Sequence, residues 1–535
     1  MRRIGLCALL TCILPSPSVT AEGIVTAGIH LARVAGGDET IGAFYTDGQD
    51  DLFWLGHSDP QRARLSTFLA VADSADLHGL PPDRYGSQAL RELLAGARTQ
   101  SDLMRLDVEI TRRFVEFADA LRFGVLEPGR VVPAIKRQPG AHDPATLVRL
   151  AKSSDLSRIL SALVPPGPEY GRLVSERQRL LTLILEGGWG PEIRAGRLEL
   201  GDQGSAVVAL RNRLVLMNYL DPRSETVFDD VITEAVRRFQ ADHGLHSDGI
   251  AGPATIAALN VSARDRLRAV LVAMERERWG PGERGRRHVL VNLTDFHARL
   301  IDAGEEVFRT RSVIGKAVPD RETPEFSDVM THMVINPSWN VPRSIVVKEY
   351  LPRLRKNPGA VSHLQIIDHR GRVVSRGRSF SKYSARSFPY SMRQPPGPRN
   401  ALGSVKFMFP NPYNIYLHDT PSQSLFSQPV RAFSHGCVRL DDPAEFAEAL
   451  LAEQSDDPRG LFEGIRATGQ ERTVMLEEPV PVHLIYRTAI PKPGGGMEYR
   501  ADIYGRDARI WRALEAEGLT VPDVEERVAS VAAGG

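Results

Sequence analysis

One short stretch combines a cysteine with two histidines beside two runs that look like short strands. His418 follows the run Asn414-Ile415-Tyr416-Leu417, and Ser434-His435-Gly436-Cys437 precedes the run Val438-Arg439-Leu440. Short β-branched and aromatic runs bounded by polar residues predict strands. We therefore expect His418 and Cys437 to lie at the ends of neighbouring strands, joined by a polar loop. This arrangement constrains the fold more than any other feature of the chain.

The residue types in this stretch indicate nucleophilic chemistry. A thiol becomes a nucleophile when a neighbouring base removes its proton, and Cys437 has His418 and His435 nearby in sequence. Gly436 lets a carbonyl oxygen approach backbone N–H groups closely. The opposing interpretations are a buried structural cysteine, a structural histidine, or a zinc site, although paired ligand spacings for zinc are missing.

The N-terminal residues predict export. Residues 1–21 have a basic start, an apolar run over 6–14 and small residues at the end, which is typical of a cleavable signal peptide and too short for a membrane span. We expect an exported mature chain without a transmembrane helix. Lipidation at Cys12 and a retained signal anchor are the alternatives.

The cysteine count supports a chemical role for Cys437. Cys7 and Cys12 leave with the signal peptide, so the mature chain keeps Cys437 alone. Exported proteins usually pair their thiols or have none. An unpaired thiol in an oxidising compartment therefore favours a nucleophile, independently of any family.

Length and composition predict a multidomain α+β protein. The chain has 535 residues, of which 42% are hydrophobic and 25% charged, and its net charge is +1. The near-zero charge argues against nucleic acid as a partner. No metal or organic cofactor is expected, because the proposed nucleophile needs none.

Periodicity and turn residues divide the chain into segments. Residues 22–190 read as helical, with apolar helical faces over 62–77 and 106–123. Residues 196–262 predict three helices, with glycine-containing turns at 201–205 and 248–255.

The remaining segments change in character. Residues 285–480 read as β-rich, with an irregular basic insertion at about 343–394 and two closing strands at 473–476 and 482–486. Residues 481–535 form a C-terminal extension to which we assign no chemistry.

The stretch around Cys437 resembles the signature of the L,D-transpeptidase (YkuD-type) catalytic domain. That signature is a histidine followed, within twenty residues, by Ser/Thr-His-Gly-Cys, and the resemblance implies that Cys437 is the nucleophile and His418 its base. Many members carry Asn where this chain has Arg439, a change that resembles the large Gram-negative periplasmic subgroup. Residues 22–190 and 196–262 resemble the scaffold and the three-helix peptidoglycan-binding domains of that subgroup.

The resemblance also implies a reaction. It implies tetrapeptide stems of peptidoglycan as donor and acceptor, 3→3 cross-links as product, and carbapenems as covalent inhibitors. The insertion at 343–394 resembles a mobile lid, or else it is a solvated charged loop. Rival functions are L,D-carboxypeptidase or endopeptidase activity, attachment of a lipoprotein, and a catalytically silent scaffold that binds the wall.

Further residues are candidates for contact with the substrate. Arg439 is expected to bind a substrate carboxylate through its planar fork of donors, and Asp419 adjoins the predicted base. The aromatic residues Trp339, Phe407 and Tyr416 are expected to form cleft walls, with packing in the core as the alternative for each.

Overall fold

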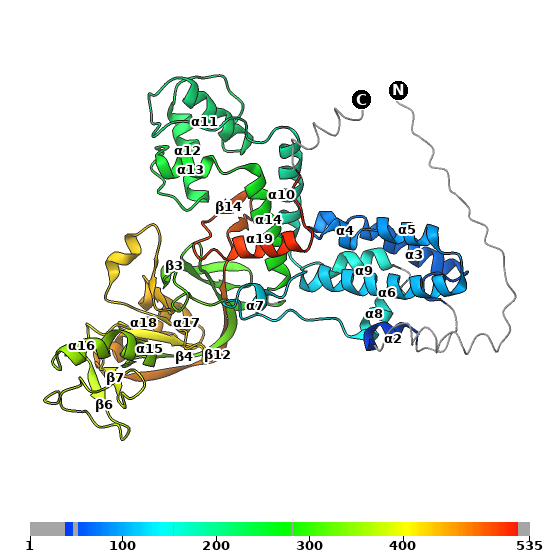
Figure 1. Cartoon of the computed structure of the whole chain (residues 1–535). Helices are drawn as coiled ribbons and strands as arrows, with labels where there is room; N and C mark the ends of the chain where they lie inside the picture. Colours follow the sequence, from blue (N-terminus) through cyan, green and yellow to red (C-terminus); the bar gives the residue numbers. More distant parts are fainter. Residues whose placement is uncertain (1–37, 46–51, 154, 281, 523–535) are drawn as a thin grey trace. The chain divides into compact units, whose positions relative to one another are not determined.

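The computed structural model describes residues 38–45, 52–153, 155–280 and 282–522 (Figure 1). The predicted signal peptide lies outside these ranges. Contacts group the chain into two compact units: Met1–Phe123 with Gly140–Val164, and Gly124–Pro139 with Pro165–Gly535. The predicted domain limits stay predictions. No helix in the described ranges is both long and apolar enough to cross a membrane.

The first unit is helical where it is described, and an aromatic cluster forms part of its core. Trp54, Phe68, Phe114 and Phe117 are almost fully buried, with ring centroids 5.3–6.1 Å apart. Its elements are α2 (Glu39–Gly42), η1 (Ala43–Tyr45), α3 (Asp59–Ala72), η2 (Ala75–His78), α4 (Pro82–Tyr85), α5 (Gln88–Gly96), α6 (Gln100–Phe123), α8 (Pro144–Ala151) and α9 (Leu156–Leu163).

A buried carboxylate on α6 holds the segment before α3. Asp107 accepts hydrogen bonds from the backbone N–H groups of Phe53, Trp54 and Leu55 at 2.8–2.9 Å, and from the Tyr45 hydroxyl at 2.8 Å. Buried N–H groups need such an acceptor because water cannot reach them. Asp107 thereby fixes the main chain that places Trp54 in the aromatic cluster.

Removing this carboxylate is expected to destabilise the first unit. Each buried N–H left without an acceptor costs about 1–3 kcal/mol, so Asp107→Ala lowers the free energy of unfolding by at least about 3 kcal/mol. Urea unfolding followed by hydrogen-exchange mass spectrometry reports the two units separately. The control is Arg112→Ala on the same helix, which breaks a surface ion pair with Glu109 and costs less than about 0.5 kcal/mol. Equal losses in both variants would contradict the assignment.

The second unit begins with helices and contains the three-helix module predicted for 196–262. The module packs α11 to α13 around a core that includes Leu210, Phe228 and Phe239, and Asp229 caps α12 by accepting from the Ile232 N–H at 3.0 Å. The helices before the sheet are α7 (Pro128–Val131), α10 (Pro168–Leu185), α11 (Ser205–Leu216), α12 (Asp230–Asp242), α13 (Pro253–Leu259) and α14 (Ala263–Arg278).

A nine-stranded sheet forms the centre of the second unit. Its order is β10-β3-β11-β9-β8-β4-β12-β1-β2, and β3 also pairs with β2, so the sheet closes on itself. Closure gives β2 a second neighbour and so covers its outer edge, while β10 stands at the end of the strand order beside β3. The strands are β1 (Arg287–Asn292), β2 (His297–Asp302), β3 (Glu305–Gly315), β4 (Phe326–Ile335), β8 (Val405–Met408), β9 (Leu417–His418), β10 (Ala432–Ser434), β11 (Val438–Leu440) and β12 (Arg472–Ile485).

Two helices complete the sheet core, and one strand differs from expectation. Phe446 on α17 (Pro443–Leu451) and Phe462 on α18 (Pro458–Ala467) are buried in the same cluster as the strands. The prediction of two closing strands is wrong, because β12 is a single strand. Its pairing with β4 shifts register between Met475 and Val480. A local bulge of this kind interrupts the alternation of apolar residues that the prediction followed.

The segment Trp339–Gln394, here called the inserted subdomain, has a core of its own. Its buried side chains include Leu354, Ile366, Phe380 and Phe388. Its elements are β5 (Trp339–Asn340), α15 (Arg343–Ile345), a π-helical turn (Val346–Tyr350), α16 (Leu351–Lys356), β6 (Gln365–Ile367) and β7 (Ser391–Gln394), with sheet order β5-β7-β6.

The C-terminal extension adds β13 (Ala489–Pro491), β14 (Met497–Tyr499) and α19 (Arg506–Ala516). Together with the helical units and the closed sheet, these elements confirm the multidomain α+β fold class.

Candidate active site

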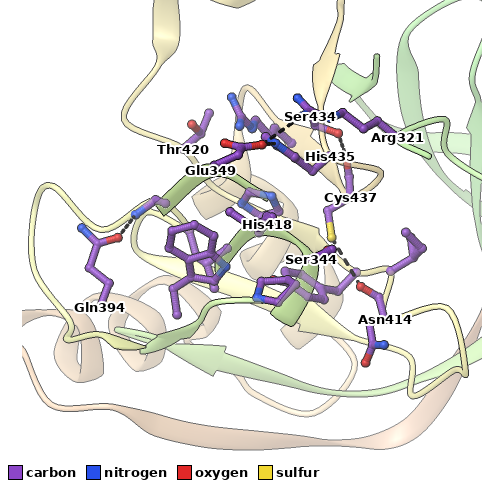
Figure 2. A pocket seen from close by; sticks show the side chains of 18 of the residues that line it. Arg321, Ser344, Glu349, Gln394, Asn414, His418, Thr420, Ser434, His435 and Cys437 are labelled. Carbon is purple, nitrogen blue, oxygen red and sulfur yellow. Dashed lines mark hydrogen bonds and ion pairs between the residues drawn. The ribbon is translucent and has the colours of Figure 1, made fainter. Parts of the chain in front are cut away.

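Two adjacent strands bring the predicted base and nucleophile together. β9 and β11 pair in parallel, with Val438 opposite Leu417 and Arg439 opposite His418. His418 ends β9, and Cys437 immediately precedes β11. The predicted strand at 438–440 is confirmed, whereas in the predicted run 414–417 only Leu417 is in a strand, which it forms with His418. Both side chains line a cavity of about 560 Å³ (Figure 2).

The environment of His418 keeps its imidazole neutral. The ring is buried, and its Nδ1 hydrogen-bonds to the main-chain oxygen of Asp419. A carbonyl oxygen only accepts, so Nδ1 carries the proton and Nε2 keeps a lone pair. Burial lowers the pKa of His418 to about 3, and the positive charges of Arg439 and Lys406 act in the same direction. The ring can therefore accept a proton at Nε2.

The thiol of Cys437 is also held in its neutral form. Burial raises the pKa of Cys437 to about 11, although hydrogen bonds from Tyr416 and the charge of Arg439 act in the opposite direction. The sulfur donates to the main-chain oxygen of Asn414 at 3.6 Å rather than to the imidazole of His418. The site therefore contains a thiol and a neutral imidazole, not an ion pair.

The loop before Cys437 is fixed by its own hydrogen bonds. The Ser434 hydroxyl donates to the Cys437 carbonyl at 2.5 Å and accepts from the Gly436 N–H at 3.0 Å. Gly436 has φ +118°, which favours glycine, and its carbonyl accepts from the Thr323 hydroxyl at 2.7 Å. Within the described ranges, the Cys437 N–H has no hydrogen-bond partner. This group is thus free to bind an oxyanion.

His435 points to the inserted subdomain. Its Nε2 lies 2.6 Å from Oε1 of Glu349, which also pairs with Arg321 at 2.9 Å. The side chain of His435 is 34% exposed, and the ring lines the same cavity. Among the described residues, no group of three or more His, Cys, Asp or Glu side chains is placed to hold a metal ion.

Three of the predicted contact residues line the cavity, and two do not. Trp339, Tyr416 and Arg439 are on its wall. Phe407 is fully buried in the sheet core against Phe446, with centroids 4.8 Å apart, because its position on β8 faces inward. The assignment of Phe407 to the cleft is therefore wrong.

The side chain of Asp419 binds neighbouring residues of the protein instead of contributing to the predicted substrate site. Its carboxylate accepts from the N–H and hydroxyl of Ser404 at 2.7 and 2.8 Å and from the Thr420 N–H, and it does not line the cavity. Asp419 ties the end of β9 to the residue before β8. Its assignment to substrate binding is corrected accordingly.

Sequence reasoning missed several residues that shape the site. Ser434 belongs to the quoted motif, and its hydroxyl was a usable signal for a loop contact. Thr323 and Glu349 reach the motif from more than 80 residues away, at Gly436 and His435. Their contacts depend on tertiary structure, and no local sequence pattern predicts them.

Comparison with known families places these residues in a recognised domain. Residues 286–475 match the family model described as "L,D-transpeptidase catalytic domain". Residues 286–475 are an L,D-transpeptidase catalytic domain. Residues 39–176 match a scaffold domain, and residues 203–259 match a domain described as "Putative peptidoglycan binding domain".

Among proteins with assigned names, one from Haemophilus influenzae, named "Putative L,D-transpeptidase", is 31% identical over 224 residues. The match covers 42% of this chain and 45% of that protein, so the chain spans less than half of its relative's length.

Solved structures that are similar include two L,D-transpeptidases at 16% identity. One is from Xylanimonas cellulosilytica (residues 123–326; 55% of this chain and 98% of that one; TM-score 0.18). The other is from Stackebrandtia nassauensis (57% and 98%; TM-score 0.22).

The neutral state of the thiol in the L,D-transpeptidase domain predicts a pH profile. Iodoacetamide reacts with the thiolate, so the alkylation rate of Cys437 is expected to rise about tenfold per pH unit until the pH approaches 11. Mass spectrometry of the modified peptide measures the rate, with Cys437→Ala as the background. His418→Gln is expected to keep the same profile. A plateau below pH 8 that His418→Gln removes would instead indicate a thiolate–imidazolium pair.

Proposed function

We propose that the protein is a cysteine-dependent L,D-transpeptidase that forms 3→3 cross-links between peptidoglycan tetrapeptide stems in the periplasm. The observation that carries the proposal is the meeting of Cys437, His418 and Arg439 at one cavity of the L,D-transpeptidase domain. Peptidoglycan lies outside the cytoplasmic membrane, and the predicted signal peptide at residues 1–21 agrees with that location. The domain matched at 203–259 supports binding of the polymer.

The first half of the reaction acylates the enzyme. His418 Nε2 accepts the thiol proton as the sulfur of Cys437 attacks the carbonyl carbon of the L-centred residue, diaminopimelate, in the donor stem. The Cys437 N–H donates to the developing oxyanion. The C–N bond to terminal D-alanine then breaks, and His418 returns the proton to the leaving amine. A thioester and free D-alanine result.

The second half releases the enzyme. The side-chain amine of an acceptor stem attacks the thioester carbon, His418 accepts its proton, and the C–S bond breaks. The thiolate recovers that proton, and an amide bond now joins the two stems. The inserted subdomain, which contributes Trp339, Glu349 and His363 to the cavity wall, favours amine over water by restricting access to the thioester.

Arg439 is placed to recognise an anionic donor. It lines the cavity, forms no ion pair within the described ranges, and its buried Nε has no hydrogen-bond partner. Burying an unpaired charge is costly unless a ligand completes it. The donor stem carries free carboxylates of the required geometry. Binding one would also offset the charge that lowers the pKa of His418, and so would make the base stronger when substrate is present.

The activity is tested directly with a disaccharide-tetrapeptide and mass analysis of the products. We expect a cross-linked dimer, and loss of at least about a thousandfold in rate for Cys437→Ala, because the covalent route is then closed. A carbapenem is expected to label the wild type and not Cys437→Ala. Tripeptide without dimer would indicate hydrolysis, and an adduct with an added lipoprotein peptide would indicate attachment. No product would indicate a silent scaffold, and labelling of Cys437→Ala would contradict the nucleophile.

The role of Arg439 is tested by comparing KM for a donor with a free carboxylate and for a donor without it. Arg439→Gln is expected to raise KM for the tetrapeptide by about 10–100-fold, as the loss of a charge-assisted pair worth about 1.5–3 kcal/mol implies. With a donor that is amidated at its diaminopimelate carboxylate, the difference in KM between wild type and Arg439→Gln should be much smaller.

The control for Arg439 is Lys406→Gln. Lys406 also lies near His418, yet it does not line the cavity, so its KM should stay unchanged. Equal KM values for wild type and Arg439→Gln would remove Arg439 from substrate recognition.

A further inference from the structure

The C-terminal extension contacts the segment that holds the catalytic loop. Arg506, the first residue of α19, is fully buried, and its Nη2 donates to the Thr323 carbonyl at 2.7 Å. Thr323 is the residue whose hydroxyl donates to Gly436, next to Cys437. Two consecutive hydrogen bonds therefore join the extension to the residue before the nucleophile.

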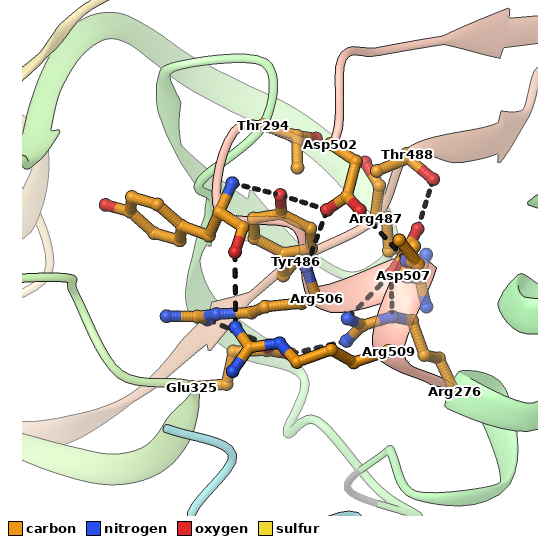
Figure 3. A network of polar contacts seen from close by, with 12 residues as sticks. Arg276, Thr294, Glu325, Tyr486, Arg487, Thr488, Asp502, Arg506, Asp507 and Arg509 are labelled. Carbon is orange, nitrogen blue, oxygen red and sulfur yellow. Dashed lines mark hydrogen bonds and ion pairs between the residues drawn. The ribbon is translucent and has the colours of Figure 1, made fainter. Parts of the chain in front are cut away.

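The guanidinium of Arg506 is held in place from several sides. It pairs with Glu325 at 2.9 Å (Figure 3) and with Glu322 at 3.2 Å. It also lies 4.6 Å from the ring centroid of Tyr504 and 5.1 Å from that of Tyr486. A planar guanidinium with carboxylate partners and aromatic faces has little freedom to move. Arg506 thus presents a fixed donor to the Thr323 carbonyl.

The hydroxyl of Thr323 is fully committed to two backbone groups. It accepts from the Gly315 N–H at 2.9 Å and donates to the Gly436 carbonyl at 2.7 Å. Tyr504, also in the extension, donates its hydroxyl to the Gly315 carbonyl at 2.6 Å. Two residues of the extension therefore complete the contacts around Thr323: Tyr504 binds the Gly315 carbonyl, and Arg506 binds the Thr323 carbonyl.

Holding the Gly436 carbonyl also fixes the next N–H. The described chain has no cis peptide bonds, and in a trans peptide the carbonyl of one residue and the N–H of the following one point in opposite directions in one plane. With its carbonyl held by Thr323, the peptide between Gly436 and Cys437 cannot rotate. The Cys437 N–H, which has no partner in the described part of the chain, then keeps one direction.

We propose that Thr323 and Arg506 are positioning residues for acyl transfer, which orient the Cys437 N–H toward the oxyanion. The inference rests on the proposed function and assigns a role in it to the C-terminal extension. Neither residue lines the cavity, so both act through the Gly436–Cys437 peptide. An oxyanion donor that is free to turn away stabilises the transition state less, because its orientation must be recovered in each turnover.

The test separates oxyanion chemistry from the reactivity of the thiol. Acylation by the tetrapeptide or a carbapenem passes through an oxyanion, whereas alkylation by iodoacetamide does not. Thr323→Val keeps the side-chain shape and removes the hydroxyl. We expect it to lower kcat and the carbapenem acylation rate by about 10–100-fold, with KM and the alkylation rate within about twofold of wild type. Thr323→Ser, which restores a hydroxyl, is expected to recover most of the loss.

A second pair of variants covers the case in which Thr323→Val does not fold. Arg506→Lys keeps the charge but loses the fork that reaches both Glu325 and the Thr323 carbonyl. Its matched control is Arg276→Lys, because Arg276 pairs with Glu325 at 2.8 Å but the guanidinium that donates to the Thr323 carbonyl is that of Arg506. We expect the selective loss of acylation in Arg506→Lys and not in Arg276→Lys.

The outcomes distinguish this inference from the proposed function. Absence of both dimer and carbapenem labelling in the wild type would refute the function itself. With an active wild type, unchanged acylation in Thr323→Val and Arg506→Lys overturns the positioning role. Parallel loss of acylation and alkylation overturns it too, since that pattern indicates general damage to the site, as does a failure of Thr323→Ser to recover activity.

Discussion

The parallel pairing of β9 with β11 is the contact on which the site depends. It sets His418 opposite Arg439 and places Cys437 one residue before its strand. Parallel strands need a long connection, and here that connection is the loop 419–437, which carries the motif itself. A register shift of one residue would turn Arg439 from the cavity to the opposite face. The closed sheet on both sides of the pair prevents such a shift, because each strand already has neighbours on two edges.

Burial determines the protonation states of Cys437 and His418. It raises the pKa of the Cys437 thiol to about 11 and lowers that of His418 to about 3, so the resting site holds no charge separation between them. A neutral thiol is less susceptible to oxidation than a thiolate, so the neutral state that burial imposes on Cys437 also protects it. The positive charges that remain near His418 are those of Arg439 and Lys406. In the proposed function, an anionic donor pairs with Arg439 and thereby increases the basicity of His418, so that substrate binding and activation of the base are coupled through one side chain.

The sequence predicted the parts of this structure that depend on local pattern. The strand after Cys437 and the three helices of the small module followed from periodicity and turn residues. The prediction failed where one strand continued through an interruption in the apolar alternation, as in β12, and where a strand residue could face either side, as with Phe407. Thr323, Glu349 and Arg506 were not predicted to act at the site, because each reaches it through contacts between distant segments. A local sequence pattern contains no information about such contacts.

The segment Glu322–Glu325 shows why the extension cannot be separated from the catalytic core. The Glu325 carboxylate is shared by Arg276 on α14 and Arg506 on α19, and its main chain pairs with the segment around Ile135. Three stretches of chain, all distant in sequence, therefore meet at Glu325, and of the two arginines Arg506 is the one that also donates to the Thr323 carbonyl. Buried ion pairs contribute little net stability compared with apolar packing. A buried charge without its partner is strongly destabilising, however, so the ion pairs restrict how these segments can be arranged. Within this network Arg506 holds Thr323, and the Thr323 hydroxyl holds the peptide before Cys437, whereas Arg276 contacts Glu325 and Asp507.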